Sequence, residues 1–125
     1  MNIVQTDNAP KAIGPYSQAI RAGDLLFVAG QLPLSPDGAL VGEGDIRAQT
    51  RAVLANLGAI LEAAGSSMRQ VVKTTVFLTD LADFAGMNEI WDAWVVAGQA
   101  PCRATVNSRL ARPEWRVEIV VTAAA

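Results

Sequence analysis

Two strand-like segments near the end of the chain carry an arginine and a glutamate among their polar residues. In residues 102–107 the even positions are apolar and the odd ones polar, and in residues 115–121 the larger apolar residues stand at odd numbers. Because side chains alternate across a strand, we expect Arg103, Thr105 and Glu118 to lie opposite the core. If the two strands are near each other in one sheet, a forked cation and a carboxylate face the same space. Such a pair suits a small anionic substrate.

The chain contains no histidine, which removes several kinds of catalysis. Ser-His-Asp and Cys-His nucleophilic sites, histidine-based zinc sites and paired-histidine ribonuclease chemistry all need that side chain. Cys102 is the only cysteine, so we expect no intrachain disulfide and no thiolate cluster for a metal. We interpret Cys102 as a small buried residue on the core side of its strand.

Composition indicates a compact, mildly acidic protein with a single domain, residues 1–125. The chain has 51% hydrophobic and 18% charged residues, a net charge of -2 and a pI near 5.0. Nucleic-acid binders usually gather Lys and Arg into a basic patch, so nucleic acid is not an expected partner. The first residues lack a basic and apolar leader, and no later segment is long enough to span a bilayer. We therefore expect a cytoplasmic protein.

The remaining pattern predicts the elements that position these residues. Glycine and proline mark the turns, aspartates stand where helix caps belong, and apolar residues recur at spacings of two in strands or three and four in helices. The predicted elements are strands at 16–20 and 25–31 around a Gly23-Asp24 turn, a loop at 33–44, a helix from Asp45 to a cap at Gly65, a strand at 71–79, a helix capped by Asp80 that stops near Gly98, and strands at 102–107 and 115–121.

This order of elements predicts an α+β fold in which both helices cover one face of a mixed sheet. The other face is left bare, and it would carry Thr75 and Phe77 together with Arg103, Thr105 and Glu118. A mixed polar and aromatic face on so small a domain suggests a partner subunit. The alternative is a solvated face, which antiparallel sheets often have.

Other motifs are weaker. Gly42-Glu43-Gly44 lacks the preceding strand and the later glycine of a dinucleotide-binding motif, so we interpret it as a flexible loop. Asn88 is either an exposed helix residue or a partly buried amide that needs hydrogen-bond partners. It stands beside an apolar stripe that we interpret as core or subunit contact, with ligand stacking as the alternative: Phe84, Met87, Trp91 and Trp94.

Six segments, taken in this order and spacing, are specific to one family. They are Ile13-Gly14-Pro15-Tyr16-Ser17-Gln18, Ala29-Gly30-Gln31, Val72-Lys73-Thr74-Thr75-Val76-Phe77-Leu78, Phe84 with Asn88, Pro101-Cys102-Arg103-Ala104-Thr105-Val106, and Val117-Glu118-Ile119. On these segments the chain resembles the Rid family, also called YjgF/YER057c/UK114, over essentially its whole length. The resemblance implies a chorismate-mutase-like α+β fold, assembled as a homotrimer with active sites between neighbouring subunits.

For the RidA branch, the resemblance implies hydrolysis of reactive enamines and imines to 2-keto acids and ammonia. The implied substrates include 2-aminoacrylate, 2-iminobutanoate and 2-iminopropanoate. Arg103 matches the arginine that holds the substrate carboxylate, and Glu118 matches the carboxylate proposed to orient or deprotonate the attacking water. The other residues that match positions lining the pocket are Tyr16, Gly30, Asn88 and Thr105.

The residues available agree with this chemistry. An imine carbon is already electrophilic, so positioning and proton transfer suffice, without a metal or another cofactor. Thr105 replaces a frequent cysteine and Ala29 a frequent serine of RidA members, which leaves the substrate range and the subfamily open. Arg103 has the alternative of a structural ion pair with a neighbouring acid.

Two other functional classes remain open at this point. The chain can be a ribonuclease or translation inhibitor, an activity reported for some relatives, although its acidity and its lack of histidine weigh against this reading. It can also be a non-enzymatic small-molecule-binding or chaperone-like protein that uses the same cleft.

Overall fold

The structure is a computed structural model that describes residues 1–125. Neither α-helix combines the length and the apolar character needed to cross a membrane. The elements in chain order are β1 (Asn2–Val4), β2 (Ala19–Ala22), β3 (Leu25–Gln31), α1 (Ile46–Ala63), the 3-10 helix η1 (Met68–Gln70), β4 (Val71–Leu78), the 3-10 helix η2 (Leu81–Asp83), α2 (Phe84–Trp94), β5 (Cys102–Asn107) and β6 (Val117–Ala124).

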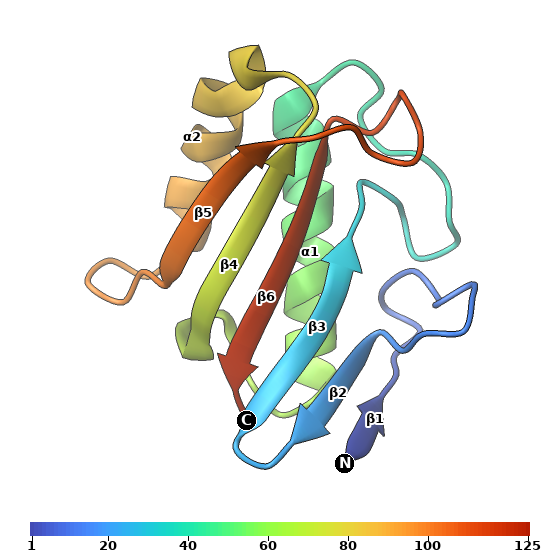
Figure 1. Cartoon of the computed structure of the whole chain (residues 1–125), viewed down its shortest axis with the longest axis vertical. Helices are drawn as coiled ribbons and strands as arrows, with labels where there is room; N and C mark the ends of the chain where they lie inside the picture. Colours follow the sequence, from blue (N-terminus) through green and yellow to red (C-terminus); the bar gives the residue numbers. More distant parts are fainter.

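The strands form one mixed sheet in the order β1-β2-β3-β6-β4-β5 (Figure 1). Every pair of neighbours is antiparallel except β4 and β5, which run parallel. Parallel neighbours need a crossover connection, and α2 lies in the connection between β4 and β5. The last strand, β6, therefore lies inside the sheet between β3 and β4, and it carries Glu118 into the middle of the sheet.

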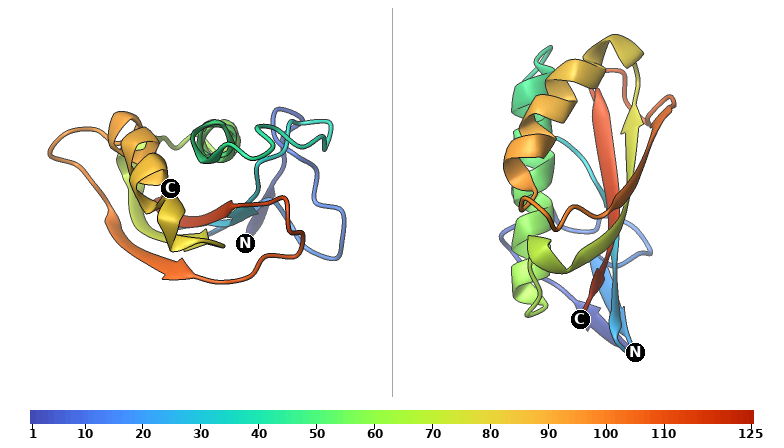
Figure 2. Two further views of the ribbon diagram at one scale, coloured as in Figure 1. Left: turned by 90° about the horizontal axis from the view of Figure 1, so that it is seen from above. Right: turned by 90° about the vertical axis from the view of Figure 1, so that its left-hand side faces the viewer.

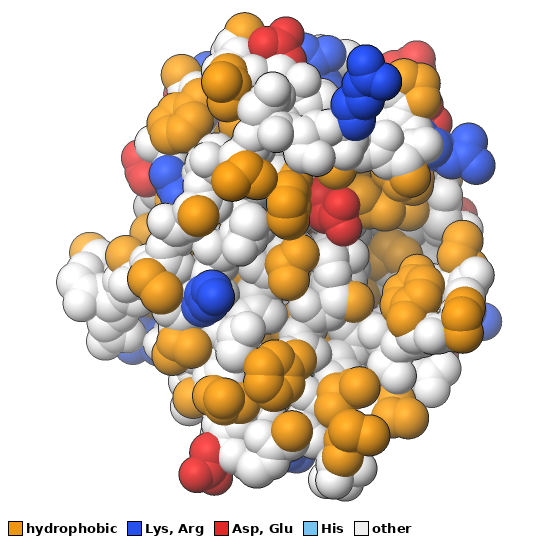
Figure 3. Space-filling model, in the orientation of Figure 1, with side chains coloured by type: hydrophobic (Ala, Val, Ile, Leu, Met, Phe, Trp, Pro, Cys, Tyr) orange, Lys and Arg blue, Asp and Glu red, His pale blue; other side chains and the backbone are white.

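Both helices lie on the same face of the sheet, which confirms the predicted α+β arrangement (Figure 2). The apolar stripes of the helices and one row of side chains from the strands form a core of 22 buried residues. The other face, which we call the open face, carries no helix (Figure 1). It presents many apolar and few charged side chains to solvent (Figure 3). Phe27 is one of the apolar side chains and is 48% exposed.

The helix α1 begins and ends at its predicted caps. The Asp45 side chain accepts a hydrogen bond from the Ala48 amide at 3.1 Å, which satisfies one of the free amides of the first turn. At the other end Gly65 has a φ of +75°, a conformation that glycine adopts without strain. The predicted Gly23-Asp24 turn is also confirmed, because β2 and β3 pair up to Ala22 and Leu25 on either side of it.

The predicted ends of the second helix are wrong. Asp80 caps η2, not α2, by accepting a hydrogen bond from the Ala82 amide at 2.9 Å. Asp83 occupies the N-cap position of α2. At the other end the helix stops at Trp94, because Val95 has an extended backbone, and it does not reach Gly98.

Several strand boundaries and one strand face also differ from the prediction. β2 begins at Ala19 instead of residue 16, and β6 begins at Val117 instead of residue 115. In β4 the register shifts between Val71 and Lys73. This irregularity leaves Val72 46% exposed, whereas regular alternation along the strand would place it on the same face as the buried Val76.

Candidate functional site

Arg103 and Thr105 lie on the helix side of the sheet, so their predicted position on the open face is wrong. In the parallel pairing of β4 and β5, Arg103 stands beside Thr74 and Thr105 beside Val76. Thr74 and Val76 are buried beneath the helices, and side chains at paired positions point to the same face. The apolar row of β5, which is an edge strand, faces the open side instead and stays outside the core.

The same reversal changes the environment of Cys102. We predicted a buried residue, but Cys102 is exposed. Its thiol donates a hydrogen bond to the Val72 carbonyl at 2.9 Å. Cys102 therefore belongs to the exposed row of the edge strand and not to the core.

The Arg103 guanidinium is held against α2 by an amide and two aromatic rings. Its Nη1 donates a hydrogen bond to Asn88 Oδ1 at 2.7 Å. The guanidinium carbon lies 5.3 Å from the centre of the Trp91 ring and 5.9 Å from that of Phe84, within the range of a cation–π contact. Asn88, which was predicted to line the pocket, therefore contacts Arg103, and two rings of the apolar stripe on α2 flank the guanidinium.

Arg103 takes part in none of the ion pairs of the chain. The alternative reading of Arg103 as one half of a structural ion pair therefore has no support within one chain. The guanidinium has five N–H donors, and the hydrogen bond to Asn88 leaves most of them available to an anion. Close by on the same strand, the Thr105 hydroxyl is buried and has no hydrogen-bond partner.

Glu118 lies on the open face, as predicted, in the middle of the sheet. It pairs with Phe77 of β4, and it lies directly against Gly30 of β3. A Cβ added to Gly30 would stand 2.9 Å from the Glu118 Cδ and closer still to its Oε2. Only glycine leaves the carboxylate enough room at this position. Partial burial raises the pKa of the Glu118 carboxyl above its ordinary value of 4.5, because burial disfavours the charged form.

A cavity of about 630 Å³ has Gly30, the residue against which Glu118 lies, in its wall. It corresponds to the hollow at the side of the open face, under the loops that follow β3 and precede β6 (Figures 1 and 3). The predicted residues Tyr16 and Gly30 line it, together with residues that the sequence analysis did not place at the site. These are chiefly the apolar Ile13, Leu32, Leu34 and Leu40, and the loop residues Arg112, Glu114 and Trp115.

Similar proteins identify the family of this chain. The family described as Endoribonuclease L-PSP matches residues 6–125. A RutC family protein of Pyrococcus horikoshii is 53% identical over 109 residues, which cover 86% of this chain and 86% of that protein. The chain belongs to the YjgF/Rid family.

Rid proteins with deaminase names are among its relatives. Reactive Intermediate Deaminase A, chloroplastic, of Arabidopsis thaliana is 48% identical over 118 residues, which cover 94% of this chain and 62% of that protein. The crystal structure of RidA from the Antarctic bacterium Psychrobacter matches with a TM-score of 0.92 and 39% identity over 100% of both chains. The predicted family and fold class are confirmed by these matches. The family therefore includes a protein named as a reactive intermediate deaminase, whereas the family model that matches this chain is described as an endoribonuclease.

Within one chain of this Rid protein, the predicted site residues form two groups on opposite faces of the sheet. Arg103, Asn88 and Thr105 lie on the helix side at the β5 edge, and Glu118 lies on the open face beside Gly30. The expected meeting of the guanidinium and the carboxylate within one sheet face does not occur in a single chain. We call the two groups the arginine half-site and the glutamate half-site; Tyr16, in the cavity wall next to Gly30, belongs to the second.

Proposed function

We propose that this Rid protein hydrolyses reactive enamines and imines, such as 2-aminoacrylate, 2-iminobutanoate and 2-iminopropanoate, to 2-keto acids and ammonia. The observation that carries the proposal is the arginine half-site. A guanidinium that is oriented by Asn88 and has no acidic partner is suited to a substrate carboxylate, which it can bind through two parallel hydrogen bonds. The relatedness to a reactive intermediate deaminase supports the same activity.

The proposed active unit is a homotrimer with each site between two subunits. Arg103 and Glu118 lie on opposite faces of one sheet, so one chain cannot bring both groups to a molecule of three or four carbons. A neighbouring copy can supply the missing half-site. The open face supports this assembly, because an uncovered sheet face with exposed apolar side chains such as Phe27 and Val106 is typical of an interaction surface.

The reaction needs a held substrate, one water molecule and a proton acceptor. An enamine first takes up a proton at its terminal carbon and becomes the protonated imine. As the water oxygen bonds to the carbon of the protonated imine, Glu118 accepts a proton from the water, and the product is a neutral carbinolamine. Glu118 then returns this proton to the nitrogen, the carbon–nitrogen bond breaks and ammonia leaves, while the hydroxyl oxygen becomes the keto oxygen and gives its proton to Glu118, which releases it to solvent. The 2-keto acid remains on Arg103. A positioned general base contributes about 10²–10⁴-fold to such a step.

The raised pKa of Glu118 suits this role. A base whose pKa is closer to neutral binds the proton more firmly than an ordinary exposed glutamate. The carboxylate also stabilises the positive charge of a protonated imine next to it. The cavity beside Gly30 offers space for the rest of the substrate.

The proposal is tested by coupling the purified protein to a threonine dehydratase that releases 2-iminobutanoate, and by following 2-keto acid formation. The wild type should accelerate the reaction, and Arg103→Ala should abolish the acceleration while circular dichroism shows a folded chain. Arg103→Lys is the matched control, because it keeps the charge and loses the fork, so it should raise KM more than it lowers kcat. Wild-type protein that does not exceed the rate in buffer would refute the proposal.

A ribonuclease is the second candidate, because the matched family is described as Endoribonuclease L-PSP. The net charge of -2 and the absence of histidine weigh against it, since RNA binding draws on basic residues. Incubation with labelled RNA at low and high salt separates the two. RNA cleavage that survives Arg103→Ala would favour the ribonuclease, and its absence together with imine hydrolysis would exclude it.

A further inference from the structure

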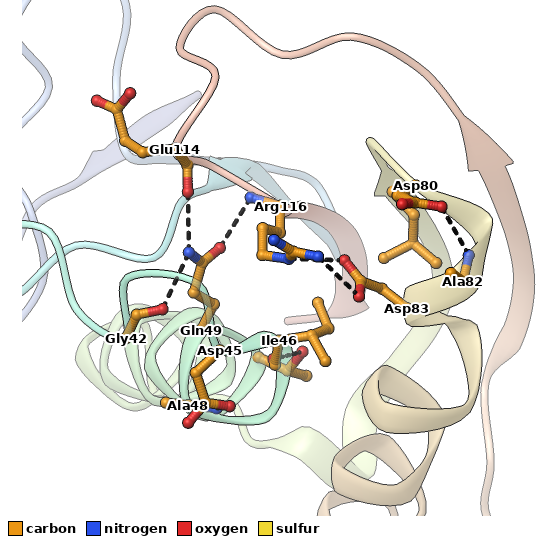
Figure 4. A network of polar contacts seen from close by, with 12 residues as sticks. Gly42, Asp45, Ile46, Ala48, Gln49, Asp80, Ala82, Asp83, Glu114 and Arg116 are labelled. Atoms are coloured by element: carbon orange, nitrogen blue, oxygen red, sulfur yellow. Dashed lines mark hydrogen bonds and ion pairs between the residues drawn. The ribbon is translucent and has the colours of Figure 1, made fainter.

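Three polar side chains from separate parts of the chain meet between the helices and the start of β6. Gln49 comes from α1, Asp83 from the N-terminus of α2, and Arg116 from the residue before β6 (Figure 4). We call these three residues the polar bridge. None of them lines the cavity, and none is hydrogen-bonded to the side chain of Arg103 or Glu118.

Gln49 is fully buried, and its carboxamide is used completely on the backbone of two loops. Its Nε2 donates to the carbonyls of Glu114 at 2.9 Å and Gly42 at 3.2 Å, and its Oε1 accepts from the Arg116 amide at 2.8 Å. Burying an amide costs free energy unless it is hydrogen-bonded. Packing alone therefore does not require an amide at this position, because an apolar side chain would fill the same space. The contribution specific to Gln49 is to fix residues 114–116.

Those residues connect directly to the glutamate half-site. Glu114 and Trp115 form part of the cavity wall, and Glu118 follows Arg116 by two positions on β6. A displacement of this segment would move the wall of the cavity and the start of the strand that carries the carboxylate. Gln49 therefore holds one half-site from the opposite side of the sheet.

The second link of the polar bridge leads to the arginine half-site. Arg116 Nε and Nη2 donate to the two carboxylate oxygens of Asp83 at 2.8 and 3.2 Å, a two-pronged pairing that also raises the pKa of Arg116 through the hydrogen bond to Asp83. Asp83 is the N-cap residue of α2. The same helix carries Asn88, which orients Arg103.

We propose that Gln49, Asp83 and Arg116 are positioning residues. Together they fix the position of the glutamate half-site relative to the arginine half-site of the same chain. This inference rests on the proposed imine hydrolysis for its effect on rate. The polar bridge touches no substrate, and it acts by fixing the 114–118 segment against α2. Displacing a catalytic group by about 1 Å can cost on the order of 100-fold in rate.

The test compares Gln49→Leu with a matched control on the neighbouring residue, Thr50→Val. Thr50 is equally buried, but its hydroxyl donates only to the Ile46 carbonyl in its own helix, at 2.7 Å. In the coupled imine assay, well below the melting temperature, Gln49→Leu should lower kcat/KM by about 10- to 100-fold. Thr50→Val should keep the wild-type value even if both variants lose stability.

Amide hydrogen exchange supplies a readout that does not depend on turnover. Gln49→Leu should speed exchange at residues 114–118, and Thr50→Val should leave these amides protected. Asp83→Asn, which keeps the side-chain size, serves if Gln49→Leu does not fold, and it should speed exchange in the first turn of α2 and lower kcat/KM. Arg116→Lys should retain more activity than Arg116→Ala, because a lysine keeps the charge without the fork.

The outcomes separate the two claims. Wild-type kcat/KM and unchanged exchange at residues 114–118 in folded Gln49→Leu would overturn the positioning role while the proposed function stands. An inactive wild type would refute the proposed function, and the exchange measurement alone would then decide whether the polar bridge fixes this segment.

Discussion

Two inactive variants of this protein should restore each other's activity when they are combined in one trimer. Arg103→Ala removes the arginine half-site and Glu118→Ala the glutamate half-site, and the two residues lie on opposite faces of one sheet. If each active site takes its arginine from one subunit and its glutamate from the neighbour, a mixed trimer contains intact sites. Neither variant alone can form one.

The expected recovery follows from the arrangement of the half-sites. In trimers assembled at random from equal amounts of the two variants, a site is intact only when the Glu118→Ala subunit supplies its arginine and the Arg103→Ala subunit supplies its glutamate. Each condition holds for half of the subunits, so about one quarter of the sites are intact in a closed ring of like interfaces. The mixture should therefore reach about one quarter of the wild-type rate per site, from near zero for each component.

The assay is imine hydrolysis coupled to a threonine dehydratase, after co-expression with two affinity tags or joint refolding. A second mixture, of wild type with the Arg103→Ala/Glu118→Ala double variant, provides the control. It should give about one quarter of the wild-type rate if the half-sites come from two subunits, and about one half if both come from one chain. Single-variant mixtures that stay inactive, together with one half in the control, would refute the shared site.

Further predictions concern three glycines and Glu118. Gly30→Ala should leave stability nearly unchanged but lower kcat/KM by about 10- to 100-fold, because the added Cβ displaces only the flexible end of Glu118; the kinetic assay and urea unfolding together check this. Gly58→Ala should raise the free energy of unfolding by about 0.5–1 kcal/mol, because the added Cβ meets no atom within 4 Å. Gly86→Ala should lower the free energy of unfolding by about 1–3 kcal/mol, because the added Cβ would lie 2.7 Å from Ile46 Cγ2. Glu118 must be ionised to accept a proton, and its pKa is raised above 4.5. On acidification, kcat/KM should therefore begin to fall while the pH is still above 4.5. A pH profile of kcat/KM that stays flat down to pH 4.5 would contradict the role of Glu118 as the base.

The elements that depend on local chemistry could be predicted from the sequence. The cap at Asp45, the glycine after α1 and the Gly23-Asp24 turn each follow from what one or two residues do to their own backbone. The apolar residues of α1 that recur at spacings of three and four, such as Leu57 and Leu61, are likewise buried as this periodicity predicts. Such features need no knowledge of the partner elements.

The buried carboxamides of α1 could not be predicted in this way. Asn56 belongs by periodicity to the polar side of the helix, but it is buried and donates to the carbonyls of Leu32 and Leu34. Gln49 is buried for the same reason, since it binds Glu114 and Arg116. Hydropathy classes both residues as polar, and their burial depends on loops that are distant in sequence.

The mistaken face of β5 has a cause that bears on function. Alternation shows that one row of a strand is apolar, but it does not show what covers that row. In β5 the apolar row of Cys102, Ala104 and Val106 points to the open face, and Val106 remains 38% exposed. An apolar row on an uncovered face favours association with another copy. In such an assembly, a neighbouring subunit would cover the apolar row of β5. Arg103 lies on the opposite face of β5, against α2 and without an acidic partner, so it forms one half of a site that a second subunit must complete.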